Sequence, residues 1–172
     1  MDGSTALNLL ALFVSAGALA TSFGVSLRQL RLADNSNVLP VIIDMFKETR
    51  SPEFLASVEY IRHELAAGHP HDNGYRHLPE EPKAHIRRVG MFYDDVGRLV
   101  AHGVVDERLV LGTYHRNVQR MWEFLGPYIY AERAEHDTLT MAYFEDLAAR
   151  ARATSGRAIH AQLGLRRLPP PV

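Results

Sequence analysis

The sequence contains no cysteine, which excludes a disulfide framework and a cysteine nucleophile. A secreted domain often uses disulfides and a cytoplasmic domain gains little from them, so this absence agrees with a cytoplasmic location. The sequence also lacks a G-x-S-x-G turn and a glycine-rich phosphate-binding loop, and nothing orders its serines and histidines into a triad. Catalysis is therefore unsupported, and we expect no catalytic residue and no cofactor.

Lysine is nearly absent, because 17 of the 19 basic residues are arginine, a bias that we attribute to a GC-rich bacterial genome. Residues 34–146 hold 19 acidic and 12 basic residues, whereas residues 147–172 hold five arginines and no acid. Nucleic acid would require a basic face on the folded domain, so we expect no nucleic-acid partner. Two interpretations of the basic end stay open: contact with anionic lipid, at about 1 kcal/mol per base, or a solvated, disordered tail.

The first part of the chain has a long stretch without charge, residues 3–27. As a helix, its 25 residues would extend over about 37 Å, enough to cross the hydrocarbon core of a bilayer, which is about 30 Å thick. We therefore predict a single transmembrane helix, with a helix packed in a protein core as the alternative. A cleaved signal peptide fits less well, because the preceding MDGST has an acid and no base, although the sequence Ala18-Leu19-Ala20 resembles a cleavage site.

The residues in and after this stretch predict its orientation and its contacts. Arg28 and Arg31 follow it at once, and arginine favours the cytoplasmic side, so we expect the N-terminus outside and the rest of the chain inside a bacterial inner membrane. Ala16, Ala20 and Gly24 recur every four residues on one helix face. Small residues allow close approach between membrane helices, so this face predicts self-association or docking on another membrane protein.

After the uncharged stretch, apolar residues recur at helical spacing and nowhere alternate as in a strand. We predict an all-α fold, in which the transmembrane helix precedes a cytoplasmic bundle of about five helices. The expected divisions are 1–32 for the membrane helix and its continuation, 33–154 for the bundle, and 155–172 for a basic, proline-terminated tail.

Several residues mark where these helices begin and end. Ser51 and Asp106 are predicted N-caps, and Pro79 is predicted to open a helix. The strongest apolar stripe covers residues 111–125, after which Gly126 and Pro127 are expected to stop or kink the helix. We expect another helix to start at residue 137 or 138.

The loop GHPHDNGYRHLP concentrates histidine and aspartate, the ligand types of a zinc or iron site. The weak metal-binding candidates are His69, His71, Asp72 and His77. Their spacing matches no known site, and a mobile loop loses conformational entropy when it encloses an ion, so a solvated polar loop is the alternative. Three Glu-x-x-x-His pairs, among them Glu132 with His136, are interpreted as surface pairs at i, i+4.

The stretch WEFLGPYIYAER belongs to a set of residues that together resemble a family signature. From this stretch the set takes Trp122, Glu123, Pro127, Ile129, Glu132 and Arg133. Its other members are the segments 28–30, 50–54, 78–81, 92–97 and 144–145. This set resembles the signature of an uncharacterised bacterial family catalogued as a domain of unknown function, the 4760 family of such domains. The resemblance covers about residues 20–150. It implies a membrane-anchored helical protein of bacteria, and it implies no activity.

The signature residues also have a structural interpretation. We expect Trp122 to be a core anchor and Pro127 to mark the break after its helix. Glu132 and Arg133 are predicted to form an ion pair inside the bundle, with Arg50 as a further candidate for such a pair, which would be costly to break.

These observations favour a membrane-tethered helical interaction module, or an accessory subunit of a membrane complex, with no evident catalytic site. Its expected partners are the lipid bilayer and a membrane or cytoplasmic protein, or a second copy of the chain. The alternative is a metal-dependent enzyme that uses the histidine-rich loop, residues 69–77.

Overall fold

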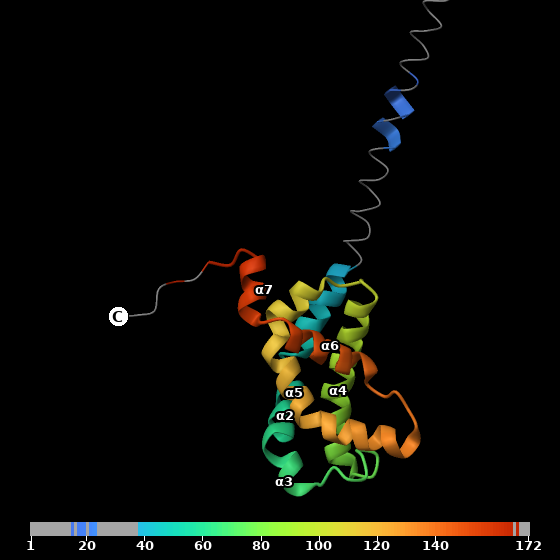
Figure 1. Ribbon diagram of the computed structural model, residues 1–172, viewed down its shortest axis with the longest axis vertical. Coiled ribbons are helices and arrows are strands. Elements are labelled where there is room, and N and C mark those ends of the chain that lie inside the picture. The colour runs from blue at the N-terminus through green and yellow to red at the C-terminus, as the bar shows by residue number, and fades with distance from the viewer. Residues whose placement is uncertain (1–14, 16, 20, 24–37, 167, 169–172) are drawn as a thin grey trace, which may run out of the picture. The chain divides into compact units, whose positions relative to one another are not determined.

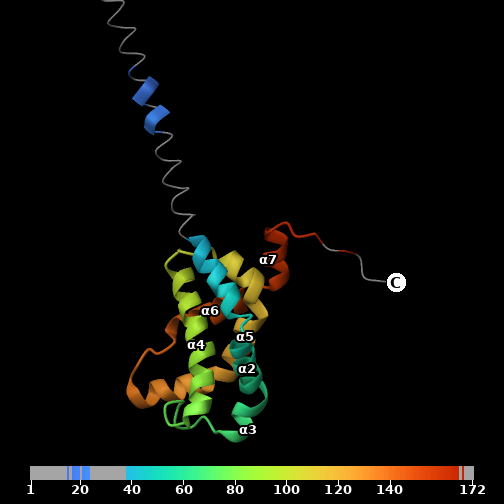
Figure 2. The same ribbon diagram turned by 180° about the vertical axis from the view of Figure 1, so that it is seen from behind.

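The computed structural model describes residues 15, 17–19, 21–23, 38–166 and 168 (Figures 1 and 2). These residues form helices, turns and loops without a strand, so the predicted all-α class is confirmed. The chain divides into two units, Met1–Phe46 and Lys47–Val172.

The first unit is helical at residues 17–19, 21–23 and 38–46. Thr21 Oγ1 donates to the carbonyl oxygens of Gly17 and Ala18, at 3.0 and 2.9 Å. Among the described residues, no helix combines the length and the apolar character that a membrane crossing requires. Most of the uncharged stretch, including the small residues predicted to pack against other helices, lies outside the described residues, as do both arginines that follow it: Ala16, Ala20, Gly24, Arg28 and Arg31.

The described part of the second unit has seven helical elements, of which the first three run on without a break. From the sequence we predicted a bundle of about five helices over residues 33–154. The elements are α2 (Pro52–Tyr60), the π-helical turn η1 (Ile61–Leu65), α3 (Ala66–Gly68), α4 (Glu80–Ala101), α5 (Glu107–His136), α6 (Ala142–Ala153) and α7 (Gly156–Gln162).

The predicted helix starts are confirmed where a local side chain supplies the cap. Ser51 Oγ accepts the N–H of Phe54 at 3.1 Å before α2, and Asp106 Oδ1 accepts the N–H of Arg108 at 2.7 Å before α5. Such caps bind N–H groups that have no partner in the first turn of a helix. Pro79 immediately precedes α4, also as predicted.

Pro127 does not stop α5, which continues through it to His136. Figures 1 and 2 both show the ribbon of α5, yellow to orange, changing direction along its length, which agrees with the predicted kink. Proline lacks the N–H that would bind the carbonyl of Glu123. Because Pro127 and Glu123 are both exposed, water can bind that carbonyl, and the helix tolerates the missing bond.

The helix expected to start at residue 137 or 138 begins at Ala142 instead, so that prediction was wrong. Asp137 and Met141 have positive φ angles, 47° and 55°, which interrupt the helical path between α5 and α6. Leu139 lies in the connecting segment and is 82% exposed.

The segment expected to form a tail contains α7. Ser155 Oγ accepts the N–H of Ala158 at 3.2 Å, and Ile159 is buried where α7 contacts α5. This helix could not be predicted from the sequence, because one buried residue, Ile159, in a short, arginine-containing stretch gives no periodic apolar pattern.

The core lies where α4, α5 and α6 meet. Trp122 on α5 is 8% exposed, and its ring meets that of Phe144 on α6 edge-on at 5.0 Å between centroids, so its predicted burial is confirmed. Gly97 on α4 faces the backbone of Tyr143 so closely that a Cβ atom would overlap the Tyr143 carbonyl. Glycine at this position therefore allows α4 and α6 to approach closely.

Candidate functional site

Three functional side chains share one face at the C-terminal end of α5: Glu132, Glu135 and His136, at i, i+3 and i+4. Glu132 is fully buried. Its Oε2 accepts the backbone N–H of Arg76 at 3.0 Å, and its Oε1 lies 2.9 Å from Nε of the same arginine. The loop between α3 and α4 is thereby fastened to α5.

The loop is held at two further points. Gly74 has a φ of 74° and lies so close to Glu132 that a Cβ atom would come within 2.8 Å of the Glu132 Cα. Only glycine combines this backbone conformation with this close approach at no steric cost. Tyr128 on α5 donates its hydroxyl to the carbonyl oxygen of His69 at 2.6 Å. The backbone of the loop is thus built onto α5, although most of its histidine side chains are exposed.

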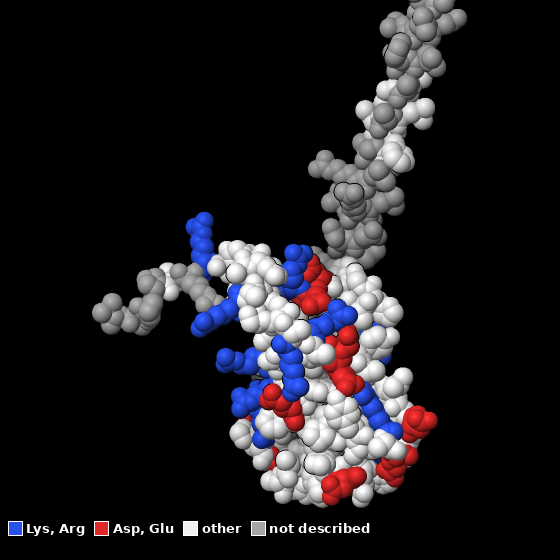
Figure 3. All heavy atoms as spheres, viewed as in Figure 1, with Lys and Arg blue, Asp and Glu red and all other residues white. Residues whose placement is uncertain are grey.

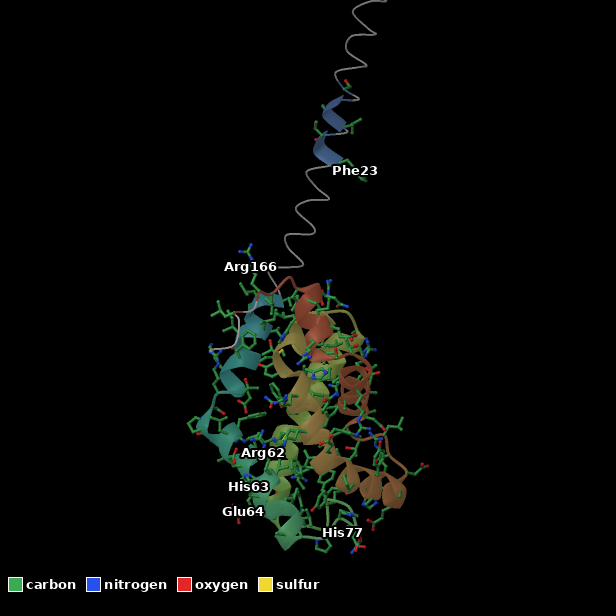
Figure 4. All side chains as sticks on the ribbon, turned by 60° about the vertical axis from the view of Figure 1, so that its left-hand side comes forward. Phe23, Arg62, His63, Glu64, His77 and Arg166 are labelled. Atoms are coloured by element: carbon green, nitrogen blue, oxygen red, sulfur yellow. The ribbon has the colours of Figure 1, made fainter. Side chains whose placement is uncertain are left out.

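This arrangement brings His77 to the end of α5. Its Nε2 lies 3.0 and 3.1 Å from the two carboxylate oxygens of Glu135, and its ring stacks on that of His136 at 6.3 Å between centroids. Potential ligand atoms of His77, Glu135 and His136 all lie within 4.8 Å of one another, and all three residues are exposed. We refer to these three residues as the end cluster. Figure 4 shows His77 at the lower end of the second unit.

Of the four metal-binding candidates from the loop, His77 alone joins the end cluster. His71 Nδ1 lies 3.7 Å from Asp72 Oδ1, and both side chains are exposed. His69 contributes its carbonyl oxygen to Tyr128. Glu135 and His136 could not be predicted as partners of His77, because nothing in the sequence shows that the loop folds against the last turn of α5.

The predicted pair of Glu132 with Arg133 does not form, because neighbours on a helix point in different directions. Glu132 pairs with Arg76, and Arg133 pairs with Glu145 on α6 through its Nη1. Arg133 Nε also donates to the carbonyl of Thr140 at 2.9 Å. The candidate Arg50 is exposed.

Glu145 is the acceptor at the centre of this second ion pair. Burial raises its pKa, but hydrogen bonds from Arg133 and Tyr130 outweigh burial and hold the pKa below its usual value. The same hydrogen bond from Tyr130, followed by burial, raises the pKa of the Tyr130 hydroxyl. These groups join α5 to α6 and offer no free base or nucleophile.

Among the described residues, Ser57 and His85 most resemble a catalytic pair of a serine nucleophile and a histidine base. Ser57 Oγ lies 3.0 Å from His85 Nδ1 in a cavity of about 740 Å³ between α2 and α4. However, Ser57 donates its hydroxyl hydrogen to the carbonyl of Glu53 at 2.8 Å. In the contact between Ser57 and His85, the Nδ1–H group of the histidine is then the donor and the serine oxygen is the acceptor. His85 therefore does not act as the base that would activate the serine.

The opposite part of the body, around α7, is basic. Arg116 and Arg157 line a cavity of about 510 Å³ between α5 and α7, together with His115 and His160. Figure 3 shows Lys and Arg side chains along the left edge of this face, on the side of α7, while acidic side chains lie mainly further to the right.

Five exposed arginines form no ion pair with any residue that the structure describes, and we call them the free arginines: Arg116, Arg120, Arg152, Arg157 and Arg166. Acidic partners are present for eight other described arginines: Arg62, Arg76, Arg87, Arg88, Arg98, Arg108, Arg133 and Arg150. Figure 4 places Arg166 at the upper end of the second unit, far from His77.

The fold and these two surfaces define an all-helical domain with an acid-and-histidine cluster at one end and a basic surface around α7 at the other. The chain matches the family described as Domain of unknown function (DUF4760) over residues 16–151, and it belongs to that family, as its signature residues predicted. The match includes α2 to α5 and most of α6, and it ends before α7. No curated protein and no solved structure matches the chain.

Proposed function

We propose that this chain is a single-pass, membrane-tethered helical interaction module, or an accessory subunit of a membrane complex, with its second unit in the cytoplasm of a bacterium. The observation that carries the proposal is the uncharged stretch 3–27, followed at once by Arg28 and Arg31. The small residues Ala16, Ala20 and Gly24 would allow this segment to pack on a second copy or on another membrane helix.

The free arginines support a lipid-facing role for the α7 end. Each basic residue near an anionic bilayer contributes about 1 kcal/mol, and none of these five forms an ion pair with a residue that the structure describes. Exposed leucines accompany them: Leu163, Leu165 and Leu168, the last of which is 93% exposed. Leucine next to arginine suits the boundary between headgroups and acyl chains.

Membrane fractionation of the full-length chain tests the tether. We expect the chain to stay in the membrane pellet after washes in high salt and in alkaline carbonate, because a spanning helix does not depend on charge screening. A matched variant, Val14→Lys with Ser15→Lys, places two charges near the middle of the stretch, at about 3 kcal/mol each, and should appear in the soluble fraction. Release of the wild-type chain by salt alone would overturn the tether.

Orientation has its own test. A reporter fused after Val172 should be active in the cytoplasm, because Arg28 and Arg31 favour that side. Activity only outside the inner membrane would reverse the topology and would favour an exported protein.

A metal-dependent enzyme that uses the loop 69–77 is the second candidate function. The approach of His77 to Glu135 and His136 favours it, since these are zinc-ligand types. The carboxylate beside the cluster, Glu132, is fully buried and bound to Arg76, so it is not placed to act as a general base. The interaction module therefore remains the proposal that the observations support best.

A further inference from the structure

We infer that His77, Glu135 and His136 bind one divalent transition-metal ion of the zinc class, which fastens the loop before α4 to the end of α5. Two imidazoles and a carboxylate are a ligand set that Zn²⁺ uses with water as the fourth ligand. The inference does not depend on the membrane tether, because all three ligands lie in the second unit.

The distances within the end cluster are close to those of a bound site. With bonds of about 2.0–2.1 Å, ligand atoms around a tetrahedral zinc ion lie roughly 3.3 Å apart. His77 Nε2 is already 3.0 Å from Glu135, and the widest separation in the cluster is at most 4.8 Å. Because all three side chains are exposed, rotations of their side chains can close that gap without moving the core.

The loop is already positioned before any ion binds. A mobile loop would lose conformational entropy when it encloses an ion, which would weaken metal binding. Here Gly74 lies against α5, Tyr128 binds the His69 carbonyl, and Glu132 binds the backbone of Arg76. Most of the ordering cost therefore belongs to folding and not to metal binding.

Glu132 provides an independent observation at the site. Its Oε1 is buried and accepts no hydrogen bond from any described residue, although the charge of Arg76 lies nearby. The same oxygen lies 3.5 Å from Nε2 of His136. A carboxylate that faces the other ring nitrogen of a metal-binding histidine commonly fixes the ring and increases its basicity, and Glu132 would have this role with Nδ1 of His136 as the metal ligand.

The charge of the surroundings also favours a cation. Glu132 and Glu135 together carry two negative charges against one positive charge on Arg76, which leaves an excess of one negative charge. His136 is the last residue of α5, where the partial negative charge of the helix C-terminus adds to that excess.

The test is a zinc titration of the purified full-length chain in detergent, carrying no histidine tag, followed by calorimetry. We expect one Zn²⁺ per chain and a higher melting temperature with Zn²⁺, since an ion that binds the folded state stabilises it. His77→Ala, His136→Ala and Glu135→Gln should each weaken binding at least about tenfold. These side chains are exposed, so the variants should fold.

The matched control is the double variant His69→Ala with His71→Ala, which removes two loop histidines outside the end cluster. It should bind Zn²⁺ like the wild type. Two results would overturn the inference: a wild-type chain without saturable one-to-one binding, or variants of His77 and His136 that bind as tightly as the wild type. A control variant that loses binding would also overturn it, because the ion would then be held by His69 or His71.

Discussion

Asp94 on α4 caps the N-terminus of α6, and its removal should destabilise the body strongly. Met141, the residue at the cap position of α6, offers no side-chain hydrogen bond. Asp94 Oδ1 instead accepts the backbone N–H groups of Tyr143 and Phe144, at 2.9 and 3.1 Å. The Asp94 carboxylate, on a neighbouring helix, thus caps α6 in the way that a local side chain caps α2 and α5.

The magnitude follows from these contacts. Loss of an N-cap costs about 0.5–2 kcal/mol, and a buried donor left without a partner costs about 1–3 kcal/mol. Asp94 also pairs with Arg98 at 3.1 Å, but that arginine is about half exposed, so its pair adds only about 0.3–0.5 kcal/mol. We expect Asp94→Ala to reduce the free energy of unfolding by about 3 kcal/mol, and Asp94→Asn, which retains an acceptor, by about 1 kcal/mol.

Urea unfolding followed by circular dichroism measures both changes, and a thermal scan should show a fall of about 10 °C for Asp94→Ala. The neighbouring Asp95 gives the matched control, because its side chain is 65% exposed and its one hydrogen bond among the described residues comes from Arg98. Asp95→Ala should change the stability by less than about 0.5 kcal/mol. If Asp94→Ala and Asp95→Ala have equal effects, the cap contributes nothing and our reasoning about α6 is refuted.

Three other changes test the core and the junction of α5 with α6. Gly97→Ala places a methyl group against the backbone of α6 and should cost more than about 2 kcal/mol in thermal unfolding, whereas Gly68→Ala meets nothing within 4 Å and should be neutral or slightly stabilising. Trp122→Ala should cost about 3–5 kcal/mol, and wild-type fluorescence should be blue-shifted; a red, readily quenched emission with an unchanged melting temperature would place this residue on the surface. The lowered pKa of Glu145 means that its ion pair with Arg133 stabilises the fold above about pH 4.5 and is lost as the pH falls through the lower folded-state pKa. The stability difference between wild type and Glu145→Gln should therefore shrink between pH 6 and pH 3, and a constant difference would contradict this assignment.

Most of the fold could be predicted because its signals are local. Ser51 and Asp106 cap helices a few residues away, and the apolar period of α5 places Trp122 in the core. The start of α6 was misplaced because its cap, Asp94, lies 49 residues before Tyr143 in the chain. Sequence patterns of helical period carry no information about such a distant acceptor.

The end cluster was predictable only in part, for the same reason. The spacing of Glu132, Glu135 and His136 on one helix face can be read from the sequence. The partner His77 comes from a loop whose position depends on a contact between Arg76 and Glu132, 56 residues apart. The polar side chains of this loop predict a solvated backbone. In the structure, however, the buried carboxylate of Glu132 accepts the backbone N–H of Arg76 in the loop.

The proline in α5 has a consequence for amide exchange. Because Pro127 has no N–H, the carbonyl of Glu123 lacks its helical partner, and the series of hydrogen bonds along α5 is interrupted there. The interruption divides α5 into two limbs, one before Pro127 that contains Trp122 and one after it that ends at His136. Helical segments separated in this way can open as distinct cooperative units, each with its own protection against deuterium. The limb that ends at His136 holds the α3–α4 loop through Glu132 and α6 through Arg133. One local opening of that limb would therefore expose loop, cluster and α6 junction together, while the limb that contains Trp122 stays closed.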